Sequence, residues 1–554
     1  MKRLKYMSMM GLAALLLTTW SACSDDTDIP GGENPEEARA YTTVTIAVPN
    51  GVAETRAGTT ADTDDDNTTE AGSEDEYKVK TANLYLFPGG AGSSFGSATL
   101  KEIISINQFT QMTASTADAK TIVWTSKKTA LTPGDYRIYI VVNGTVNGVT
   151  DGSKNSLTEA DFLAKTTADA TGVIAAVPEA GLVMASRSPK SDNMNTLPYI
   201  AQTITKDPEQ TIAATVERMM GKITVTAGGT SVSSTSNVNV YTSFSSTVTA
   251  ISNITNITLK GYYVVNARKE GYYFRHVDKE NSATSSLTVD NYGNSTTSLP
   301  YVVDPKTYSK TYTGTPAVLA GSYADWYLQG SGAFGLLSFS SFLGTYTAMP
   351  SYSSSAAETK VAAYCYENTM LKEKQKNGYT TGIVFKAEIA PSKMMKASAG
   401  SGGVEENSTF TSMSEIFYHS GIFYKDIAAL KEAGVLLADG TTSSSASGAP
   451  ADLKKNDVQC FKKGSADGKF VCYYPYWIKH ISSDDVAEDV MEFGIVRNNV
   501  YKVTVTGIQG VGKDGVTEDI ITDTETDDPT TVLLNVKLSI KPWTVRTNSA
   551  VLGR

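Results

Sequence analysis

The stretch "TTVTIAVP", residues 42–49, alternates polar with apolar residues and points to the fold class. Val44, Ile46 and Val48 fall on one face of such a segment, as expected of a β-strand with one side in a core. The composition agrees, because 29 tyrosines against 16 phenylalanines and abundant Ser, Thr, Val and Gly favour strands and turns. We therefore expect an all-β protein with a few short helices.

The strand pattern restarts within "TVERMMGKITVTAGG", residues 215–229, which indicates a domain boundary near residue 216. A chain of 554 residues has room for several domains. The pattern predicts two β-sandwiches in tandem, an N-terminal domain at 57–215 and a C-terminal domain at 216–522. Further strands are expected within 76–87, 134–144, 253–267, 382–391, 469–481 and 494–512, and short helices within 156–165 and 414–434.

The first 23 residues have the organisation of an export signal. Three basic residues among the first five precede an apolar run at 6–19, which is short for a membrane span. Small residues then lead up to Cys23, an arrangement that resembles a lipoprotein box. The sequence thus predicts a lipoprotein signal peptide at 1–22 and a lipid on Cys23. The alternative is a plain signal peptide that happens to contain this cysteine.

Arg56 stands where the first strand gives way to an acidic stretch. Residues 57–76 are rich in Thr, Asp and Glu and hold almost no apolar residue, which is typical of a solvated segment. Proteases bind exposed, extended backbone, so the Arg56–Ala57 bond is a candidate cleavage site. The bond between Arg39 and Ala40 is the alternative, but a cut there would leave strand 42–49 attached.

The C-terminal segment, residues 523–554, joins an acidic linker to one more apolar strand. A terminal strand of this kind must bury its apolar face against a sheet. It either completes the sheet of its own domain or is given to another one. Its apolar residues are Val532, Leu534, Val536, Leu538 and Ile540, followed after Pro542 by Trp543 and Val545.

The cysteines after Cys23 are Cys365, Cys460 and Cys472. The stretch "QCFKKGSADGKFVCYY", residues 459–474, predicts a hairpin that turns near 465–468. If the turn centres on Ala466, Cys460 and Cys472 face each other across the ladder, and an export compartment would permit a disulfide. Two unpaired strand cysteines are the alternative.

The sequence gives little support for catalysis or for nucleic-acid binding. A net charge of −10, from 48 basic and 58 acidic residues, argues against a phosphate-binding surface. "GSSFG" (92–96) puts Ser94 at a nucleophile position, but a buried strand does not lead directly into it. "GSGAFG" (330–335) lacks a surrounding βαβ pattern. The three histidines are scattered, so we expect no enzyme, no cofactor and no metal site.

Several stretches carry a family resemblance when they are taken in order. They are "GDYRIYIVVNG" (134–144), "ERMMGKITV" (217–225), "YYPYWIKH" (473–480), "RNNVYKVTVTGIQGVG" (497–512) and "LSIKPWTV" (538–545). With the lipoprotein box and the Arg-Ala site, they resemble the fimbrillins, stalk subunits of type V pili of Gram-negative anaerobes. The closest resemblance is to the major subunit of the short, or minor, fimbriae.

The resemblance implies transthyretin-like sandwich domains and a route of assembly. A lipoprotein precursor would reach the outer membrane, and a trypsin-like, Arg-specific protease would cut after Arg56. The propeptide 23–56 would leave with the strand that carries Val44, Ile46 and Val48. The donor strand within 523–554 of another copy would then fill the opened groove, which is donor-strand exchange.

The resemblance also implies partners and a place in the cell. The partners would be other copies in a head-to-tail filament, accessory anchor and tip subunits, the protease, and a host or bacterial surface ligand. The protein would act in adhesion and biofilm formation within a cell-surface fimbrium. One alternative is an anchor or tip subunit of the same pilus. Another is a glycan-binding surface lipoprotein, with Tyr473, Tyr474, Tyr476 and Trp477 stacking on sugar rings.

Overall fold

The structure is a computed structural model. Most of its regular secondary structure is β-strand, as the sequence predicts. Contacts divide the chain into Met1–Arg39 and Ala40–Arg554, and every described helix and strand lies in the second part. Among the described residues no helix is long and apolar enough to cross a membrane. The described residues are 39–49, 70–90, 94–112, 121–167, 173–174, 176–187, 198–229, 239–242, 253–268, 270–278, 301–306, 327–328, 346–353, 356–369, 379–400, 402–435, 453, 455–480, 492–515 and 534–545.

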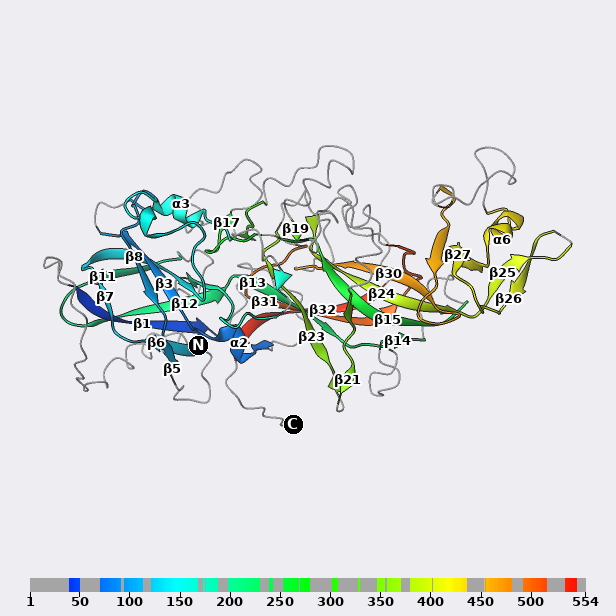
Figure 1. Cartoon of the computed structure of the whole chain (residues 1–554), viewed down its shortest axis with the longest axis horizontal. Coiled ribbons are helices and arrows are strands. Elements are labelled where there is room, and N and C mark those ends of the chain that lie inside the picture. The colour runs from blue at the N-terminus through cyan, green and yellow to red at the C-terminus, as the bar shows by residue number, and fades with distance from the viewer. Residues whose placement is uncertain are drawn as a thin grey trace, which may run out of the picture. The chain divides into compact units, whose positions relative to one another are not determined.

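The first sheet has ten strands, all from residues 40–218, in the order β4-β3-β8-β10-β12-β1-β6-β5 (Figure 1). β11 pairs with β8, and β7 pairs with β1. The strands are β1 (Ala40–Pro49), β3 (Ala82–Pro88), β4 (Glu102–Ile106), β5 (Phe109–Gln111), β6 (Thr121–Ser126), β7 (Thr129–Leu131), β8 (Gly134–Val142), β10 (Met184–Arg187), β11 (Ile200–Ile204) and β12 (Gln210–Arg218).

Strands β3 and β8 of this sheet are buried on both faces. Side chains alternate between the faces of a strand, so each of the two strands contributes side chains to two separate cores. Leu84 and Ile138 enter the inner core, where they meet residues of β1, β6, β10 and β12. Their neighbours Tyr85 and Tyr139 enter the outer core, which also holds Phe162 and residues of the second sandwich.

A second sandwich is formed by a six-stranded and a five-stranded sheet that share one core. Ile223 and Val503 from the first of these sheets pack with Ile257, Phe385 and Tyr474 from the second. The six-stranded sheet has the order β2 (Glu70–Gly72), β32 (Leu534–Val545), β31 (Asn499–Ile508), β13 (Met220–Thr226), β23 (Thr359–Tyr366) and β9 (Val173–Ile174). The other contains β14 (Val240–Tyr241), β15 (Ile254–Val265), β24 (Gly382–Pro391) and β30 (Phe470–Trp477), with β20 (Thr347–Ala348) on β15.

A smaller five-stranded sheet follows β24 and carries a helix (Figure 1). Its order is β26 (Val404–Asn407), β25 (Met394–Ala397), β28 (Ile422–Tyr424), β27 (Glu415–His419) and β29 (Gln459–Lys462). The described helices are α2 (Glu74–Tyr77), η1 (Asp151–Ser153), α3 (Glu159–Leu163) and α6 (Ile427–Glu432). The remaining strand pairs are β16 (Ala267–Arg268) with β19 (Tyr327–Leu328), β17 (Val277–Asp278) with β18 (Tyr301–Val302), and β21 (Tyr352–Ser353) with β22 (Ala356–Ala357).

Two short strands from the N-terminal part of the sequence lie in the second sandwich. β2 pairs with β32, and β9 pairs with β23. The predicted boundary near residue 216 lies within β12, and one residue, Met219, separates the end of β12 from β13. The N-terminal segment therefore supplies a whole sheet and also adds strands at both ends of the six-stranded one.

Candidate assembly site

The first strand lies inside its sheet, with neighbours on both edges (Figure 1). β1 runs parallel to β12, from Thr42 beside Gln210 to Ala47 beside Thr215. Its other edge runs antiparallel to β6 and β7. Taking β1 away would therefore leave open edges on both sides of the vacated place, and open edges readily pair with another strand.

The side chains of β1 alternate as the sequence predicts. Val44, Ile46 and Val48 are at most 1% exposed and lie in the inner core. The backbone N–H of Val44 also donates to the hydroxyl of Ser126 at 3.0 Å. Full burial of an aliphatic side chain contributes roughly 1.5–3 kcal/mol to stability. A strand in the position of β1 therefore needs apolar residues on its core face.

Two arginines bracket β1 in the sequence. Arg39 is exposed and directly precedes Ala40, the first residue of the strand. Arg56 and Ala57 lie outside the described residues. A cut after Arg39 would leave β1 joined to the rest of the chain, whereas a cut after Arg56 would separate it.

The C-terminal strand β32 lies against β31 of its own chain. The pairing is antiparallel and runs from Asn499 beside Pro542 to Ile508 beside Leu534. Val536 is partly buried against the core of the second sandwich. Of the predicted donor residues, Val532 lies outside the described part of the chain, and Leu534, Val536, Leu538, Ile540, Trp543 and Val545 lie in β32.

The position of β32 in its sheet differs from that of β1. In the first sheet the order β10-β12-β1-β6 puts β1 between two other strands, with β12 parallel to it. In the second, the matching order is β32-β31-β13-β23, with β31 parallel to β13. β32 therefore corresponds to β10 and not to β1. Its departure would leave the central pair of β31 and β13 in place.

Cys460 and Cys472 are both free, so the structure does not contain the disulfide considered for this hairpin. The bridge between Lys463 and Phe470 lies next to the turn, but β29 and β30 then belong to different sheets. Cys460 pairs with Phe417 of β27, and Cys472 pairs with Ala387 of β24. Cys472 is buried in the core of the second sandwich, while Cys460 packs against the cluster around α6.

The aromatic run at 473–477 does not form a sugar-binding surface. Tyr473, Tyr474 and Trp477 are buried. Tyr476 is partly buried against the core of the second sandwich. Stacking on a sugar ring requires exposed aromatic faces, so this segment serves packing.

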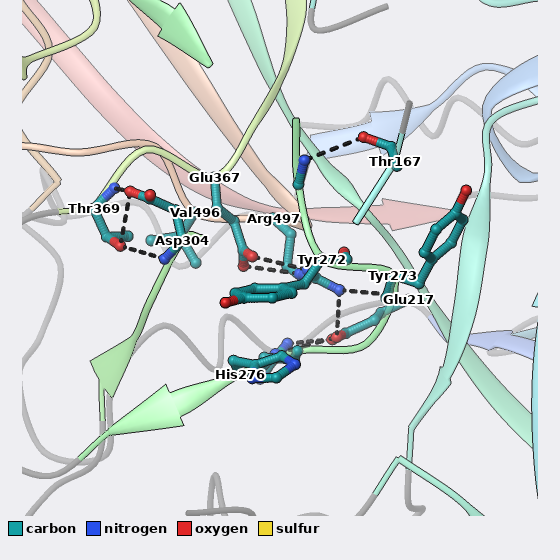
Figure 2. Close-up of polar contacts among 12 residues, drawn as sticks. Thr167, Glu217, Tyr272, Tyr273, His276, Asp304, Glu367, Thr369, Val496 and Arg497 are labelled. Carbon is teal, nitrogen blue, oxygen red and sulfur yellow. Dashed lines mark hydrogen bonds and ion pairs between the residues drawn. The ribbon is translucent and has the colours of Figure 1, made fainter. Parts of the chain in front are cut away.

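Arg497 centres a buried polar cluster where the two sandwiches meet (Figure 2). Its guanidinium donates two hydrogen bonds of 2.8 Å to the carboxylate of Glu367. It also donates to the carbonyl oxygens of Tyr272 and Tyr273, at 2.8 and 3.1 Å. Glu217, from β12, lies 3.6 Å from the same guanidinium. The cluster therefore joins the last strand of the first sheet to the residues just before β31.

The carboxylates of this cluster are compensated by two arginines. Arg275 forms an ion pair with Glu217, beside the pair of Arg497 and Glu367. Burial raises the pKa of Glu367 above its ordinary value, although the nearby Arg497 guanidinium opposes that shift. Breaking a buried pair leaves an uncompensated charge, so the cluster holds together as a unit.

A second buried cluster surrounds Glu76 of α2. Its carboxylate accepts from Lys222 at 2.7 Å, from the hydroxyl of Tyr364 at 2.6 Å and from the Ser73 N–H at 2.7 Å. Burial pushes the pKa of Glu76 upward, but Lys222 and these hydrogen bonds hold it below its ordinary value. Arg218 donates to the carbonyl oxygen of Glu76 at 2.9 Å. α2 is thus fixed to β12, β13 and β23.

Sequence reasoning missed both clusters, although their residues stand in the quoted motifs. "ERMMGKITV" contributes Glu217, Arg218 and Lys222, and "RNNVYKV" contributes Arg497. The available signal is a charged residue inside an otherwise apolar strand, since such residues are buried only when they are paired. The partners of these charged residues lie far away in the sequence. The local pattern therefore indicates that the residues are paired, but it does not predict their partners.

Replacing Arg497 with methionine is expected to lower the free energy of unfolding by about 3–5 kcal/mol. The change leaves Glu367 buried without its arginine partner, while Glu217 loses one of its two arginines and keeps Arg275. Urea unfolding measures the effect. The double variant R497M/E367Q is the matched control and should lose less than R497M, because one stranded carboxylate is removed. Equal losses would contradict the pairing.

His276 predicts a dependence of stability on pH. Its ring stacks on Tyr272, and Nε2 donates to the carbonyl oxygen of Leu163 at 2.9 Å. Burial lowers the pKa of His276 from 6.5 to about 3; the Leu163 carbonyl opposes this shift, and Arg497 adds to it. In the unfolded chain His276 therefore takes up a proton below pH 6.5, whereas in the folded chain it stays neutral down to about pH 3.

The expected result is a loss of stability as the pH falls below 6.5, by up to about 1.4 kcal/mol per pH unit from this histidine. H276Q keeps a donor for the carbonyl of Leu163 but cannot take up the proton. Urea unfolding at about pH 7 and about pH 5 should show a smaller loss for H276Q than for the parent protein. H419Q, on β27, should behave like the parent.

Comparison with known proteins finds a family model that matches the C-terminal part of the chain. The model for the C-terminal region of fimbrillin, the major fimbrial subunit protein type IV, matches residues 468–549. This range contains β30, β31 and β32. The chain is thus an all-β protein whose C-terminal region is similar to that of fimbrillin, and the resemblance expected from its motifs is confirmed there. Comparison with curated proteins gives no match.

Solved structures with some likeness include proteins of adhesion and fimbriae. A candidate cell adhesion protein from Parabacteroides distasonis ATCC 8503 has 11% identity and a TM-score of 0.40, covering 91% of this chain and 99% of its own. The tip fimbrial protein Mfa3 from Porphyromonas gingivalis, with a C-terminal truncation, has 11% identity and a TM-score of 0.31, covering 91% and 100%. A fimbrial assembly protein from Parabacteroides distasonis ATCC 8503 has 9% identity and a TM-score of 0.26, covering 63% and 95%.

Proposed function

We propose that this protein is a structural subunit of a cell-surface fimbrium that polymerises by donor-strand exchange. The observation that carries the proposal is the contrast between its first and last strands. β1 is internal and apolar, and it is followed in sequence by an Arg-containing linker, whereas β32 lies outside the central pair of its sheet. The fimbrillin match over 468–549 supports this role.

Maturation would begin with export as a lipoprotein precursor acylated on Cys23. A trypsin-like, Arg-specific protease at the outer surface would cut between Arg56 and Ala57. The propeptide 23–56 would leave together with β1, and the mature subunit would begin at Ala57. Before the cut, β1 blocks its own place in the sheet and so prevents premature assembly.

The C-terminal segment of another copy would then take the place of β1. About five apolar side chains would enter the inner core, each contributing roughly 1.5–3 kcal/mol when fully buried. Ladder hydrogen bonds would add about 0.5–1.5 kcal/mol each, and ordering the strand would cost about 1–2 kcal/mol per residue. The contact is heterologous and head-to-tail, which produces an open filament. Anchor and tip subunits and a surface ligand would be further partners in adhesion.

The experiment that tests the proposal is mass spectrometry of the protein recovered from the cell surface. An N-terminus at Ala57 and the absence of lipid are expected for a polymerised stalk subunit. A surface form that keeps an acylated Cys23 and an intact Arg56–Ala57 bond would overturn the stalk role. Such a result would point to an anchor subunit, which keeps its lipid and its first strand.

A further inference from the structure

The C-terminal strand pairs with two different segments along its length. β31 pairs with residues 534–542 of β32, from Ile508 beside Leu534 to Asn499 beside Pro542. After that point β2 runs parallel to the last residues of β32, with Glu70 beside Trp543 and Gly72 beside Val545. The last three residues of β32 therefore take their strand pairing from a segment near the N-terminus, beyond the last pair with β31.

β2 is anchored by the helix that follows it in the sequence. α2 begins at Glu74, directly after β2, and Glu76 is held by Lys222, Tyr364 and Arg218. Tyr77, the last residue of α2, packs in the inner core. A strand of three residues such as β2 would not hold the end of β32 by itself. Its position is fixed by α2.

Arg218 connects the segments next to the two strands that pair with β32. Its Nε donates to the carbonyl oxygen of Glu76 at 2.9 Å, beyond the end of β2. Nη1 of the same guanidinium donates to the side-chain oxygen of Asn498 at 3.1 Å, directly before β31. Since Arg218 is about 1% exposed, this bridge is buried. It ties the segment after β2 to the start of β31.

We propose that β2 is a clip that retains the donor strand on its own subunit and sets the rate at which it is released. This inference rests on the proposed function, because it takes β32 as the donor. β2 follows the predicted cleavage site in the sequence, so the clip stays in the mature chain and must open before β32 can leave. A subunit would thereby keep its apolar strand covered until a neighbour with a vacant β1 place accepts it.

Three variants of the full chain test the clip, each with Cys23 replaced by serine so that no lipid is attached. Each is cut with trypsin, and filament growth is followed by light scattering and electron microscopy. A71P/G72P removes the backbone N–H of two adjacent residues, one of which faces β32, and should polymerise up to roughly tenfold faster, as the loss of one ladder bond implies. T68P/T69P, which stiffens the linker just before β2, is the matched control and should match the parent rate.

The third variant separates the clip from the donor role. Ala71 and Thr544 are register partners, so A71C/T544C can be joined by a disulfide. Cys460 is replaced by serine in this variant because it is only partly buried. The oxidised protein should form no filaments, and the reduced protein should grow at the parent rate.

The outcomes distinguish the two ideas. If A71P/G72P grows at the parent rate while oxidised A71C/T544C is blocked, β32 is the donor and the clip is wrong. If oxidised A71C/T544C grows at the parent rate, β32 is not the donor, and the proposed function fails with the clip. Hydrogen exchange of the uncut chain gives a second reading, because A71P/G72P should exchange the amides of residues 543–545 faster than T68P/T69P does. Equal exchange would also overturn the clip.

Discussion

Replacing Arg56 with alanine is expected to keep the protein on the cell as a lipidated monomer that forms no filaments. Without a basic residue at this position, an Arg-specific protease has no bond to cut between β1 and β2. β1 then stays between β12 and β6, and the place for a donor strand never opens. Gel analysis of unboiled surface extracts and electron microscopy measure the loss, which should be at least about tenfold in polymer.

The matched control is R39A. Arg39 lies directly before β1, so a cut there cannot release the strand from the rest of the chain. R39A should therefore assemble like the parent, with an N-terminus at Ala57. Assembly by R56A together with failure of R39A would place the functional cut at Arg39 and would contradict the removal of β1.

Replacing Ile46 with aspartate is expected to destabilise the uncut precursor by on the order of 5 kcal/mol. Ile46 is fully buried in the inner core, so the variant loses an aliphatic contact and buries a carboxylate among apolar side chains. Urea unfolding of the uncut chain, with Cys23 replaced by serine, measures the loss. A47D is the control, since Ala47 is partly exposed on the opposite face, and it should cost much less.

The same substitution has a second expected result that a permanent core residue would not give. Once β1 has left, the mature subunit no longer contains residue 46. Filaments assembled from I46D should therefore match parental filaments in their resistance to denaturant. Weaker I46D filaments, with residue 46 found inside them, would mean that β1 stays in the assembled protein.

Local patterns account for the part of the fold that could be predicted. The alternation at 42–49 predicts both the strand and its buried face, because a period of two depends only on neighbouring residues. The short helix within 156–165 is confirmed as α3, and the hydroxyl of Thr158 accepts from the N–H of Asp161 at its start. The helix expected within 414–434 is confined to α6, and the residues before it form β27 and β28.

Contacts between distant segments account for what could not be predicted. β2 and β9 have no apolar period of their own, and they become strands because a distant edge, on β32 or β23, is there to pair with. The hairpin expected at 459–474 forms only next to its turn, because β29 and β30 pair with strands of separate sheets. The buried charges at Glu76 and Arg497 likewise depend on partners that no local pattern names.

Under the proposed strand exchange, the two cores on either side of β3 and β8 would have different lifetimes. β1 contributes to the inner core alone, and among the described residues the outer core contains none of that strand. Emptying the place of β1 would therefore open one half of the domain while Tyr85, Tyr139 and Phe162 keep their packing in the other. One core would be permanent, and a strand from a neighbour would complete the other. A subunit built this way could wait for its partner without unfolding.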